Sequence, residues 1–355
     1  MKVALDGTPL IVSSDGTARY TAELSRALAV EFPADEFLLL SDQPFPAPAD
    51  APANLRSISE PPGALSRRWW SCGLPRAMAR HHASVFHGTA FSVPYLAIRP
   101  SVLSLHDLSP WLDPAWHSRA ERIRARAPYL IWLGLATVLL TDTEAIRRAA
   151  IDYFGVPSSR VFAVPLAASA VFRPVAQAPA AVPYFLYAGT LGPRKNVPLI
   201  LDAWREVAKS HAVDLVLAGP RRADFPAIEP EPGLRIAGEA SDAALAALYS
   251  GAAAFLYPSF YEGFGLPVLE AMQCGAPVVA SRDPAIMEVA GGGAVLLDAR
   301  DRRGWVEAMA AILSRSEWRS QLRERGLGRA REFSWSRTAR LTYEVYGEAI
   351  RRFGS

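Results

Sequence analysis

Two glutamates lie on either side of a tight turn, where they could hold one ligand. Glu262 and Glu270 flank a Gly-Phe-Gly turn in the stretch YEGFGLPVLEAMQCGAPVVAS, residues 261–281. Carboxylates accept hydrogen bonds from hydroxyl groups, and the free N–H groups at the start of a helix bind anions. Gly263 and Gly265 would let the backbone approach a ligand closely. A polyhydroxylated and phosphorylated molecule, such as a nucleotide sugar, would use every one of these groups, although two solvated acids on a surface helix would give the same pattern.

A second turn in the same half of the chain carries fixed positive charge. In YAGTLGPRKNVPLI, Gly189 and Thr190 would form a flexible turn after a strand, as part of the same donor site. Arg194 and Lys195 come just before the next expected helix. Two cations beside free N–H groups suit a diphosphate, and they would stabilise the charge that develops on a leaving nucleoside diphosphate. Taken alone, the basic pair could also be solvated.

Short apolar runs that alternate with helical patterns would position these turns. This alternation predicts an α/β protein with parallel sheets and right-handed crossovers, whose ligands bind at the carboxyl ends of the strands. The runs expected to be strands are residues 3–7, 37–41, 85–89, 101–107, 137–143, 184–190, 214–220, 234–239, 253–259, 276–281 and 294–298.

A Pro- and Ala-rich stretch, residues 172–183, is expected to link two domains. We expect an N-terminal, acceptor-binding domain at residues 1–172 and a nucleotide-sugar-binding domain at residues 173–335. Residues 336–355 are expected to form an amphipathic helix that returns to the first domain. Two domains of this class that meet at a linker would leave a cleft, a common place for a ligand.

Composition narrows the class of protein. The chain has 355 residues, a net charge of +3 and two cysteines, Cys72 and Cys274, so neither nucleic-acid binding nor a disulfide framework is indicated. The N-terminus lacks the apolar core of a signal peptide, and a reducing cytoplasm fits best. The apolar run Tyr129–Leu140 is shorter than a membrane-spanning helix, and we interpret it as a buried helix end that leads into a strand.

The two turns together resemble the retaining glycosyltransferases of family 4. The resemblance rests on GTLGPRKN and YPSFYEGFGLPVLEAMQCGAPVVAS, and it extends to DGTARYTAELSRAL, LSLHDLSP and FSWSRTARLTYEVY. It implies the GT-B fold, in which two Rossmann-like, doubly wound parallel-sheet domains face each other across a cleft. Overall similarity to O-antigen and exopolysaccharide mannosyltransferases favours GDP-mannose as the donor, with UDP-sugars as the alternative.

The resemblance also implies roles for the charged residues. Glu262 would contact the donor sugar, and Glu270 would bind the ribose hydroxyls. Arg194 and Lys195 would bind the diphosphate. His106, in the His-Asp loop, would lie between donor and acceptor, although a histidine that only caps a loop is an equal alternative.

Other positions would contribute mainly backbone contacts. Phe264, Gly265 and Leu266 would contact sugar and phosphate, and Gly238 with Glu239 would contact the base. Gly16 would approach the diphosphate from the other domain. The loop around it reads Asp15-Gly16-Thr17-Ala18, whereas the family often has paired glycines there.

The resemblance further implies transfer without a metal or other cofactor. The chain contains no Asp-x-Asp pair of the kind that chelates a divalent cation in the other major glycosyltransferase fold. Arg194, Lys195 and helix N-termini would supply the positive charge instead. Retention would follow from attack on the same face of the sugar, with the leaving phosphate as the base.

Residues 67–126 contain nine arginines and only three acids, together with Trp69, Trp70, Trp111 and Trp116. Such a mixture suits contact with anionic lipid headgroups, although a solvated face with tryptophans in the core is equally compatible. The acceptor is expected to be a saccharide or a polyprenyl-linked molecule. With lipid contact it would be the lipid-linked one, and the protein would be peripheral on the inner face of the cytoplasmic membrane.

Two other functions remain open from the sequence. A sugar-nucleotide epimerase with this fold would need an acid/base pair facing the sugar, and no such pattern is evident. A non-catalytic nucleotide-binding module would not need both glutamates and both cations. A dehydrogenase is disfavoured because no G-x-G-x-x-G motif opens the chain.

Overall fold

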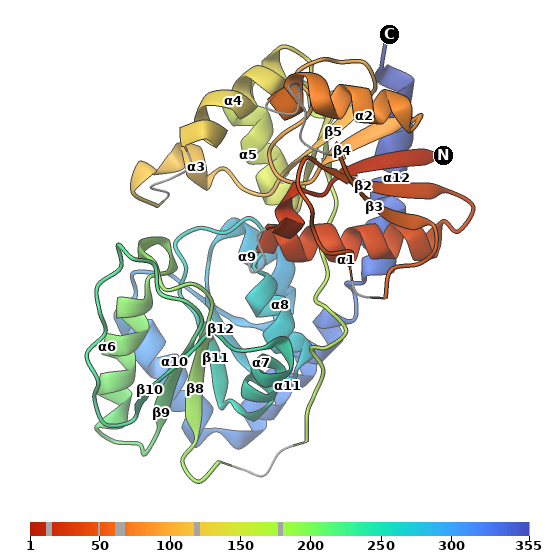
Figure 1. Ribbon diagram of the computed structural model, residues 1–355. Helices are drawn as coiled ribbons and strands as arrows, with labels where there is room; N and C mark the ends of the chain where they lie inside the picture. The colour runs from red at the N-terminus through yellow and green to blue at the C-terminus, as the bar shows by residue number, and fades with distance from the viewer. Residues whose placement is uncertain (12–15, 49, 61–67, 117–120, 177–179, 355) are drawn as a thin grey trace. The chain divides into compact units, whose positions relative to one another are not determined.

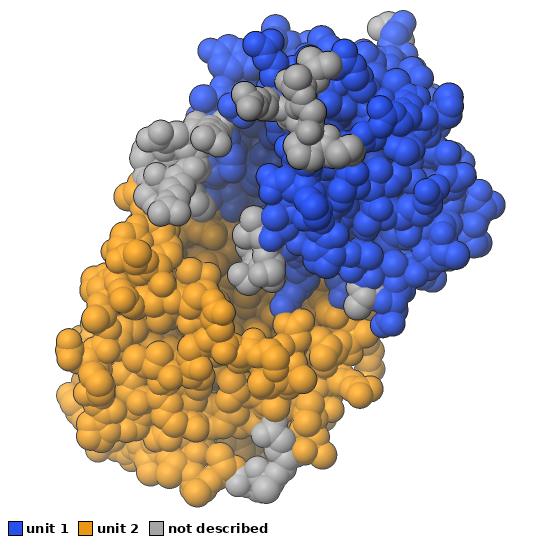
Figure 2. All heavy atoms as spheres, in the orientation of Figure 1, with its two compact units in different colours: residues 1–112, 117–166, 334–355 blue, residues 113–116, 167–333 orange. Residues whose placement is uncertain are grey.

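The computed structural model describes residues 1–11, 16–48, 50–60, 68–116, 121–176 and 180–354. It divides into two compact units, which are coloured separately in Figure 2. Unit 1 contains residues 1–112, 117–166 and 334–355, and unit 2 contains residues 113–116 and 167–333. Each unit is built around one parallel β-sheet (Figure 1).

The sheet of unit 1 has seven strands in the order β3-β2-β1-β4-β5-β6-β7, and neighbouring strands are parallel. Its strands are β1 (Lys2–Asp6), β2 (Glu36–Ser41), β3 (Leu55–Ser59), β4 (Val85–Gly88), β5 (Ser101–Leu105), β6 (Val138–Thr141) and β7 (Val161–Ala163). Its helices are α1 (Gly16–Glu31), α2 (Leu74–Arg80), α3 (Ser109–Leu112), α4 (Glu121–Trp132), α5 (Glu144–Phe154) and α12 (Trp335–Arg352). The central strands are buried along their whole length, as expected for a sheet covered on both faces.

The sheet of unit 2 has six strands in the order β10-β9-β8-β11-β12-β13, again parallel. Its strands are β8 (Tyr184–Ala188), β9 (Asp214–Ala218), β10 (Leu234–Gly238), β11 (Ala254–Tyr257), β12 (Val278–Ser281) and β13 (Val295–Leu297). Its helices are α6 (Val197–Ala208), α7 (Asp242–Gly251), α8 (Leu266–Gln273), α9 (Pro284–Ala290), α10 (Arg302–Ser314) and α11 (Ser316–Ala330). In Figure 1, α6 and α10 lie on one side of this sheet, and α7, α8 and α11 lie on the other.

Both sheets reverse their strand order at one point, between β1 and β4 in unit 1 and between β8 and β11 in unit 2. Such a switch point leaves the loops after the two strands pointing in opposite directions, and ligands of doubly wound sheets bind there. The two turns singled out from the sequence follow β8 and β11, so the fold brings them to the same switch point.

The C-terminal helix α12 belongs to unit 1, where it packs along α1. Its hydroxyl groups anchor it: Thr338 Oγ1 donates to the Pro165 carbonyl at 2.7 Å, and Tyr346 Oη lies 2.8 Å from Nδ1 of the buried His87. The helix starts at Trp335, one residue after Ser334, whose hydroxyl caps it by accepting from the Arg337 N–H.

The division between the units falls before the expected linker. Unit 2 begins at Ala167 rather than at residue 173. Phe172 is buried and its ring lies edge-on to Tyr249, with centroids 6.0 Å apart. Gln273 Nε2 donates to the carbonyls of Ser169 and Phe172 at 3.0 and 2.7 Å, which fixes this segment on unit 2.

Residues 129–140 contain the end of α4 followed by β6, as expected, but the helix end is only partly buried. Tyr129, Trp132 and Leu133 are 62, 60 and 71 % exposed. The helix buries Ala127, Leu130 and Ile131 instead, at the i, i+3, i+4 spacing of one helix face, so the intervening residues point outward. Among the described residues, no helix has both the length and the apolar character needed to cross a bilayer.

Candidate functional site

Glu262, Arg194 and Lys195 form a single ion cluster in unit 2. Lys195 Nζ donates to Glu262 Oε1 at 2.6 Å, and Arg194 Nη1 donates to Glu262 Oε2 at 3.2 Å. The two cations lie in the 3-10 turn Pro193–Lys195 after β8, and Glu262 lies in the turn after β11. Because β8 and β11 are adjacent, residues far apart in the sequence meet at the switch point.

The Glu262 carboxylate is held in its ionised form. Its side chain is only 8 % exposed, and those of Arg194 and Lys195 are 16 and 14 % exposed. Burial alone would raise the pKa of Glu262, but the two cations and the hydrogen bonds from Lys195 and Ser259 outweigh it and lower that pKa to about 2. The cluster therefore carries one more positive charge than negative, on side chains whose positions are fixed before any ligand arrives.

Two hydroxyl groups that the sequence analysis did not single out complete the cluster. Tyr257 Oη accepts a hydrogen bond from Lys195 Nζ at 2.7 Å, and Ser259 Oγ donates to Glu262 Oε1 at 2.5 Å. Arg194 Nη1 also donates to the Tyr261 carbonyl at 2.5 Å. Tyr257 is the last residue of β11, and Ser259 lies just after it. A polar residue at the carboxyl end of a buried strand is the signal that could have identified both.

The turn between Glu262 and α8 has the expected backbone form. Gly265 has φ +92° at the N-cap position of α8, a conformation that favours glycine, and Pro267 lies in the first turn. Phe264 is buried and its ring lies edge-on to Phe333, with centroids 5.9 Å apart. The backbone from Phe264 to Leu266 is therefore held in place at the start of the helix.

Glu270 lies one turn into α8 and is 3 % exposed. Tyr249, on α7, donates to its Oε2 at 3.3 Å. The carboxylate is thus positioned by a neighbouring helix, and its proposed contact with ribose hydroxyls stays a prediction.

The loops after β8, β9 and β10 are joined backbone to backbone. Gly189 N–H donates to the Ala218 carbonyl at 2.9 Å, and Gly219 N–H donates to the Gly238 carbonyl at 2.6 Å. A Cβ at Gly219, which has φ +125°, would lie 2.3 Å from the Gly189 carbonyl oxygen. Because Gly219 has no side chain, the turn at Gly189 can lie close to the turn at Gly238 and Glu239, which is expected to contact the base. The sequence analysis did not single out Gly219.

The side chains at the ends of these loops face solvent. Thr190 and Glu239 are exposed, and Gly238 has φ +65°. They are accessible to a ligand that extends from the ion cluster toward β10, as the expected base contact requires.

His106 uses both of its ring nitrogens inside unit 1. Nδ1 lies 2.9 Å from Asp142 Oδ2, and Nε2 lies 2.8 Å from the Thr89 carbonyl, which can only accept. Burial lowers the pKa of His106, but the Asp142 carboxylate outweighs burial, and the pKa is raised to about 9. The geometry favours a positioning role within the loop, whereas the expected place between donor and acceptor stays a prediction.

Gly16 is the first residue of α1 and is exposed, with nothing within 4 Å of where a Cβ would lie. Asp15 belongs to the same loop, which differs from the family pattern, and it lies outside the described residues. The approach of Gly16 to a diphosphate stays a prediction.

Three of the four tryptophans in the arginine- and tryptophan-rich segment pack against other groups of the protein, and contact of this segment with lipid headgroups stays a prediction. Trp69 is 5 % exposed, Trp111 packs edge-on against Phe154 at a centroid distance of 5.3 Å, and Trp116 stacks on Tyr261 at 5.9 Å. These rings are used in packing because each meets another aromatic or buried group. Two of the arginines, at positions 67 and 119, lie outside the described residues.

The arrangement in unit 2 can bind an anion at the cations and hydroxyl groups at the carboxylate. Across the part of the chain that the structure describes, no group of three or more His, Cys, Asp or Glu side chains could hold a metal ion. Arg194, Lys195 and the start of α8 supply positive charge at the switch point, and transfer without a metal stays a prediction.

Comparisons with known proteins cover both units. The model of the family described as Glycosyltransferase Family 4 matches residues 14–168, and that described as Glycosyl transferases group 1 matches residues 170–329. The chain is 30 % identical to the O-antigen chain mannosyltransferase B of Escherichia coli, over 98 % of this chain and 99 % of that protein.

Solved structures show the same fold. Sucrose-phosphate synthase from Thermosynechococcus elongatus superposes with a TM-score of 0.76 at 18 % identity, over 98 % of each chain. Anabaena Alr3699/HepE, in complex with UDP and glucose, superposes with a TM-score of 0.73 at 16 % identity, over 98 % of this chain and 100 % of that chain. These matches confirm the expected GT-B class, with two Rossmann-like parallel-sheet domains.

Proposed function

The chain belongs to the glycosyltransferases, with a family 4 domain followed by a group 1 domain, and from this we propose that it transfers mannose from GDP-mannose. The acceptor would be a saccharide or a lipid-linked saccharide in the synthesis of a cell-surface polysaccharide. The identity of 30 % to an O-antigen chain mannosyltransferase, over nearly the full length of both chains, carries this proposal. A second mannosyltransferase of Escherichia coli, the serotype-specific WbdA, is 35 % identical over 109 residues.

The ion cluster suggests how transfer would proceed. The bond between the anomeric carbon and the diphosphate oxygen breaks, and the electron pair leaves with the diphosphate. Arg194, Lys195 and the start of α8 would stabilise the charge that develops there. An acceptor hydroxyl forms the new bond to the anomeric carbon on the same face, and its proton passes to the leaving phosphate, which gives retention.

The remaining donor contacts follow from the positions of the loops. Glu262 would accept hydrogen bonds from sugar hydroxyls with the lone pairs that its cations leave available. Glu270 would bind the ribose, and the turn at Gly238 and Glu239 would bind the base. Gly189 and Thr190 would line the diphosphate.

The UDP complex of the Anabaena relative supports a second donor class, a UDP-sugar. The two alternatives differ in the base, and so in the contacts at Gly238 and Glu239 rather than at the ion cluster. The same mechanism would serve both.

Binding of nucleotides separates these alternatives. We expect GDP, in the absence of metal, to raise the melting temperature, since ligand at about a hundredfold its dissociation constant adds roughly 2.7 kcal/mol to the free energy of unfolding. A larger shift with UDP would favour the second donor class. Lys195→Met should remove the shift, whereas Lys209→Met should keep it. Lys209 is an exposed residue at the C-terminal end of α6, where it forms an ion pair with Glu206. No shift with either nucleotide would reject the proposal.

We also propose peripheral contact with the inner face of the cytoplasmic membrane, through the outward end of α4. Tyr129, Trp132 and Leu133 are the exposed apolar residues there, and Arg126, which is also exposed, precedes them on the same helix. Aromatic and aliphatic side chains beside a basic residue suit an anionic bilayer surface. Arg126 also belongs to the arginine- and tryptophan-rich segment, residues 67–126, for which lipid contact is expected from the sequence.

A further inference from the structure

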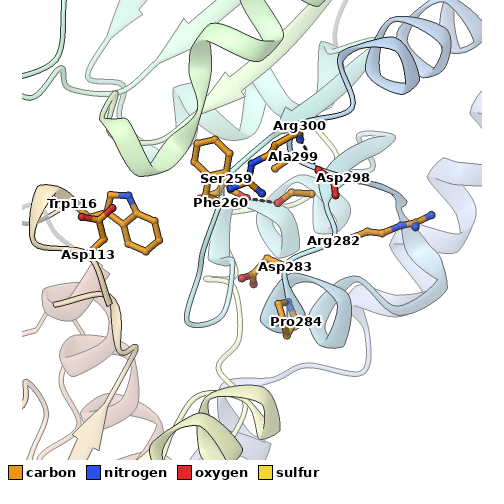
Figure 3. A pocket seen from close by; sticks show the side chains of 11 residues that line it. Asp113, Trp116, Ser259, Phe260, Arg282, Asp283, Pro284, Asp298, Ala299 and Arg300 are labelled. Atoms are coloured by element: carbon orange, nitrogen blue, oxygen red, sulfur yellow. Dashed lines mark hydrogen bonds between the residues drawn. The ribbon is translucent and has the colours of Figure 1, made fainter. Parts of the chain in front are cut away.

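A cavity lies in unit 2, at the carboxyl ends of β11, β12 and β13. Its volume is about 420 Å³, within the range of roughly 300–1,000 Å³ usual for small-molecule pockets. Figure 3 shows Asp283 and Pro284 from the start of α9, Asp298 to Arg300 from the loop after β13, and Ser259 with Phe260 from the loop after β11. Apart from Ser259, which belongs to the Glu262 cluster, none of these residues has been given a part in binding the nucleotide or the donor sugar.

One wall of this cavity is hydrogen-bonded to the ion cluster. Ser281 Oγ donates to the Ser259 carbonyl at 2.5 Å, and Ser259 Oγ donates to Glu262 Oε1. A molecule bound against Ser259 would therefore lie one hydrogen bond away from the carboxylate assigned to the donor sugar. A hydroxyl group that attacks the donor sugar would have to come close to that carboxylate.

The lining combines carboxylates with aromatic rings. Asp283 and Asp298 offer acceptor oxygens, and Phe260 is 36 % exposed. Trp116, which also lines the cavity, is held by stacking on Tyr261, with the ring planes 21° apart. A sugar ring presents hydroxyl groups at its edge and C–H groups on its face, so carboxylates and aromatic faces match its two kinds of surface.

The charge of the lining argues against an anionic ligand. Three aspartates, Asp113, Asp283 and Asp298, face two arginines. The arginines also have other contacts: Arg282 Nε donates to the Leu296 carbonyl at 2.9 Å, and the Arg300 guanidinium lies 5.3 Å from the centre of the Phe260 ring. A phosphate would meet more favourable charge at Arg194 and Lys195 than here.

Asp283 could bind a hydroxyl group either as a hydrogen-bond acceptor or, when protonated, as a donor. It is 5 % exposed, and its Oδ1 accepts from the N–H groups of Ala285 and Ile286 at the start of α9. Burial raises the pKa of Asp283 to about 6. Near neutral pH a small change in environment would therefore decide whether this carboxyl donates or accepts.

We propose that this cavity is an acceptor subsite, which binds an uncharged sugar ring of the acceptor beside the Glu262 cluster. The proposal rests on the proposed transferase function and adds the class of acceptor group and its place. Phe260 and Asp298 should then contribute to acceptor binding, whereas nucleotide binding should not depend on either residue.

The test is binding of methyl α-glycosides of mannose, glucose, galactose and N-acetylglucosamine, measured by saturation-transfer NMR with and without GDP. We expect at least one glycoside to bind the wild-type chain. Phe260→Ala and Asp298→Asn should each weaken it by about tenfold, as expected for loss of an aromatic contact or of a charge-assisted hydrogen bond. Asn at position 298 keeps an oxygen for the Arg300 N–H, which Asp298 Oδ1 accepts at 2.7 Å, so the loop should keep its form.

Matched controls are Phe353→Ala and Asp152→Asn. Phe353 is 37 % exposed, as Phe260 is, and Asp152 is an exposed aspartate on α5. Both controls should bind the glycoside as the wild type does. GDP affinity should be the same in all five proteins, because none of these residues belongs to the ion cluster.

Three results would overturn the proposal: no glycoside bound by the wild type, equal binding by Phe260→Ala and Asp298→Asn, or tighter binding of mannose 6-phosphate than of the uncharged glycoside. Failure of GDP and UDP to bind would reject the proposed function instead. The measurement without nucleotide would still test the cavity.

Discussion

Lys195 Nζ lies 2.6 Å from Glu262 Oε1, so the cation assigned to the diphosphate is already paired with the acid assigned to the sugar. Pairing keeps three charged side chains in place in a site where each is largely buried. Ligand binding then needs little rearrangement, since a diphosphate can join cations that remain in the same positions.

Replacing Glu262 should separate nucleotide binding from transfer. In Glu262→Gln the side chain keeps its shape but no longer neutralises Arg194 and Lys195. We expect GDP affinity, measured by calorimetry, to be equal to or higher than that of the wild type. The transfer rate should fall by about a hundredfold or more, because a charge that orients the sugar in the transition state is lost. Parallel losses of GDP affinity and transfer would contradict the separate roles given to the acid and the cations.

The His106–Asp142 pair should make stability depend on pH above neutrality. The pKa of His106 is raised to about 9 in the folded chain, against 6.5 unperturbed, so its contribution is fully present below pH 6.5 and is lost as pH rises through 9. The loss should be roughly 3 kcal/mol, since one pKa unit corresponds to about 1.4 kcal/mol. Urea unfolding between pH 6 and pH 10 measures it. In Asp142→Asn this decline should be absent, and an unchanged slope in that variant would exclude the pair as its source.

Gly219 should tolerate no side chain. In Gly219→Ala the new Cβ would clash with the Gly189 backbone, at a residue with φ +125°. We expect the free energy of unfolding to fall by at least about 2 kcal/mol, together with GDP affinity, because the loops after β8 and β10 would be pushed apart.

Gly328→Ala is the control for that substitution. Gly328 lies in α11 with open space at its Cβ position. It should raise stability by about 0.5–1 kcal/mol through helix propensity. Thermal or urea unfolding of both variants gives the comparison, and a Gly219→Ala protein as stable as the wild type would refute the contact.

The outward end of α4 should govern binding to anionic vesicles. Tyr129→Ser with Leu133→Ser should weaken sedimentation with phosphatidylglycerol-containing vesicles by about tenfold or more, since burying one leucine-sized side chain contributes about 1.5–3 kcal/mol. Val30→Ser, an exposed apolar position on α1 at 57 %, should have no effect. Equal binding of all variants, or no preference for vesicles with phosphatidylglycerol over phosphatidylcholine alone, would speak against this surface.

The strands that the sequence predicted are those with continuous apolar runs, because both faces of a central parallel strand are buried. It missed β3 and β7, which are edge strands. In β3 only Leu55 is buried, so the strand carries no apolar run, and β7 is apolar but only three residues long, shorter than a typical strand. The pattern along α4 was misread in part, for a related reason: an apolar residue can lie on the outward face of a helix, and composition does not distinguish the faces.

For the candidate site, the sequence predicted which residue types would gather but not which would bond to each other. That Glu262 pairs with Arg194 and Lys195 depends on β8 lying beside β11, a matter of strand order that local patterns do not specify. The partners of His106 are equally remote, since Asp142 follows β6 and Thr89 follows β4. The cavity beside Ser259 is lined by four separate segments of the chain, which no short motif could have indicated.

The return of α12 to unit 1 has a consequence for biogenesis. Residues 167–333 form a nearly continuous unit and can become compact while the chain is still being synthesised. Unit 1 instead has to wait for residues 335–352, which cover α1 and supply the Tyr346 hydroxyl beside His87. Until then it would expose apolar surface, so the amino-terminal half should be the last part to mature and the part that most needs chaperones.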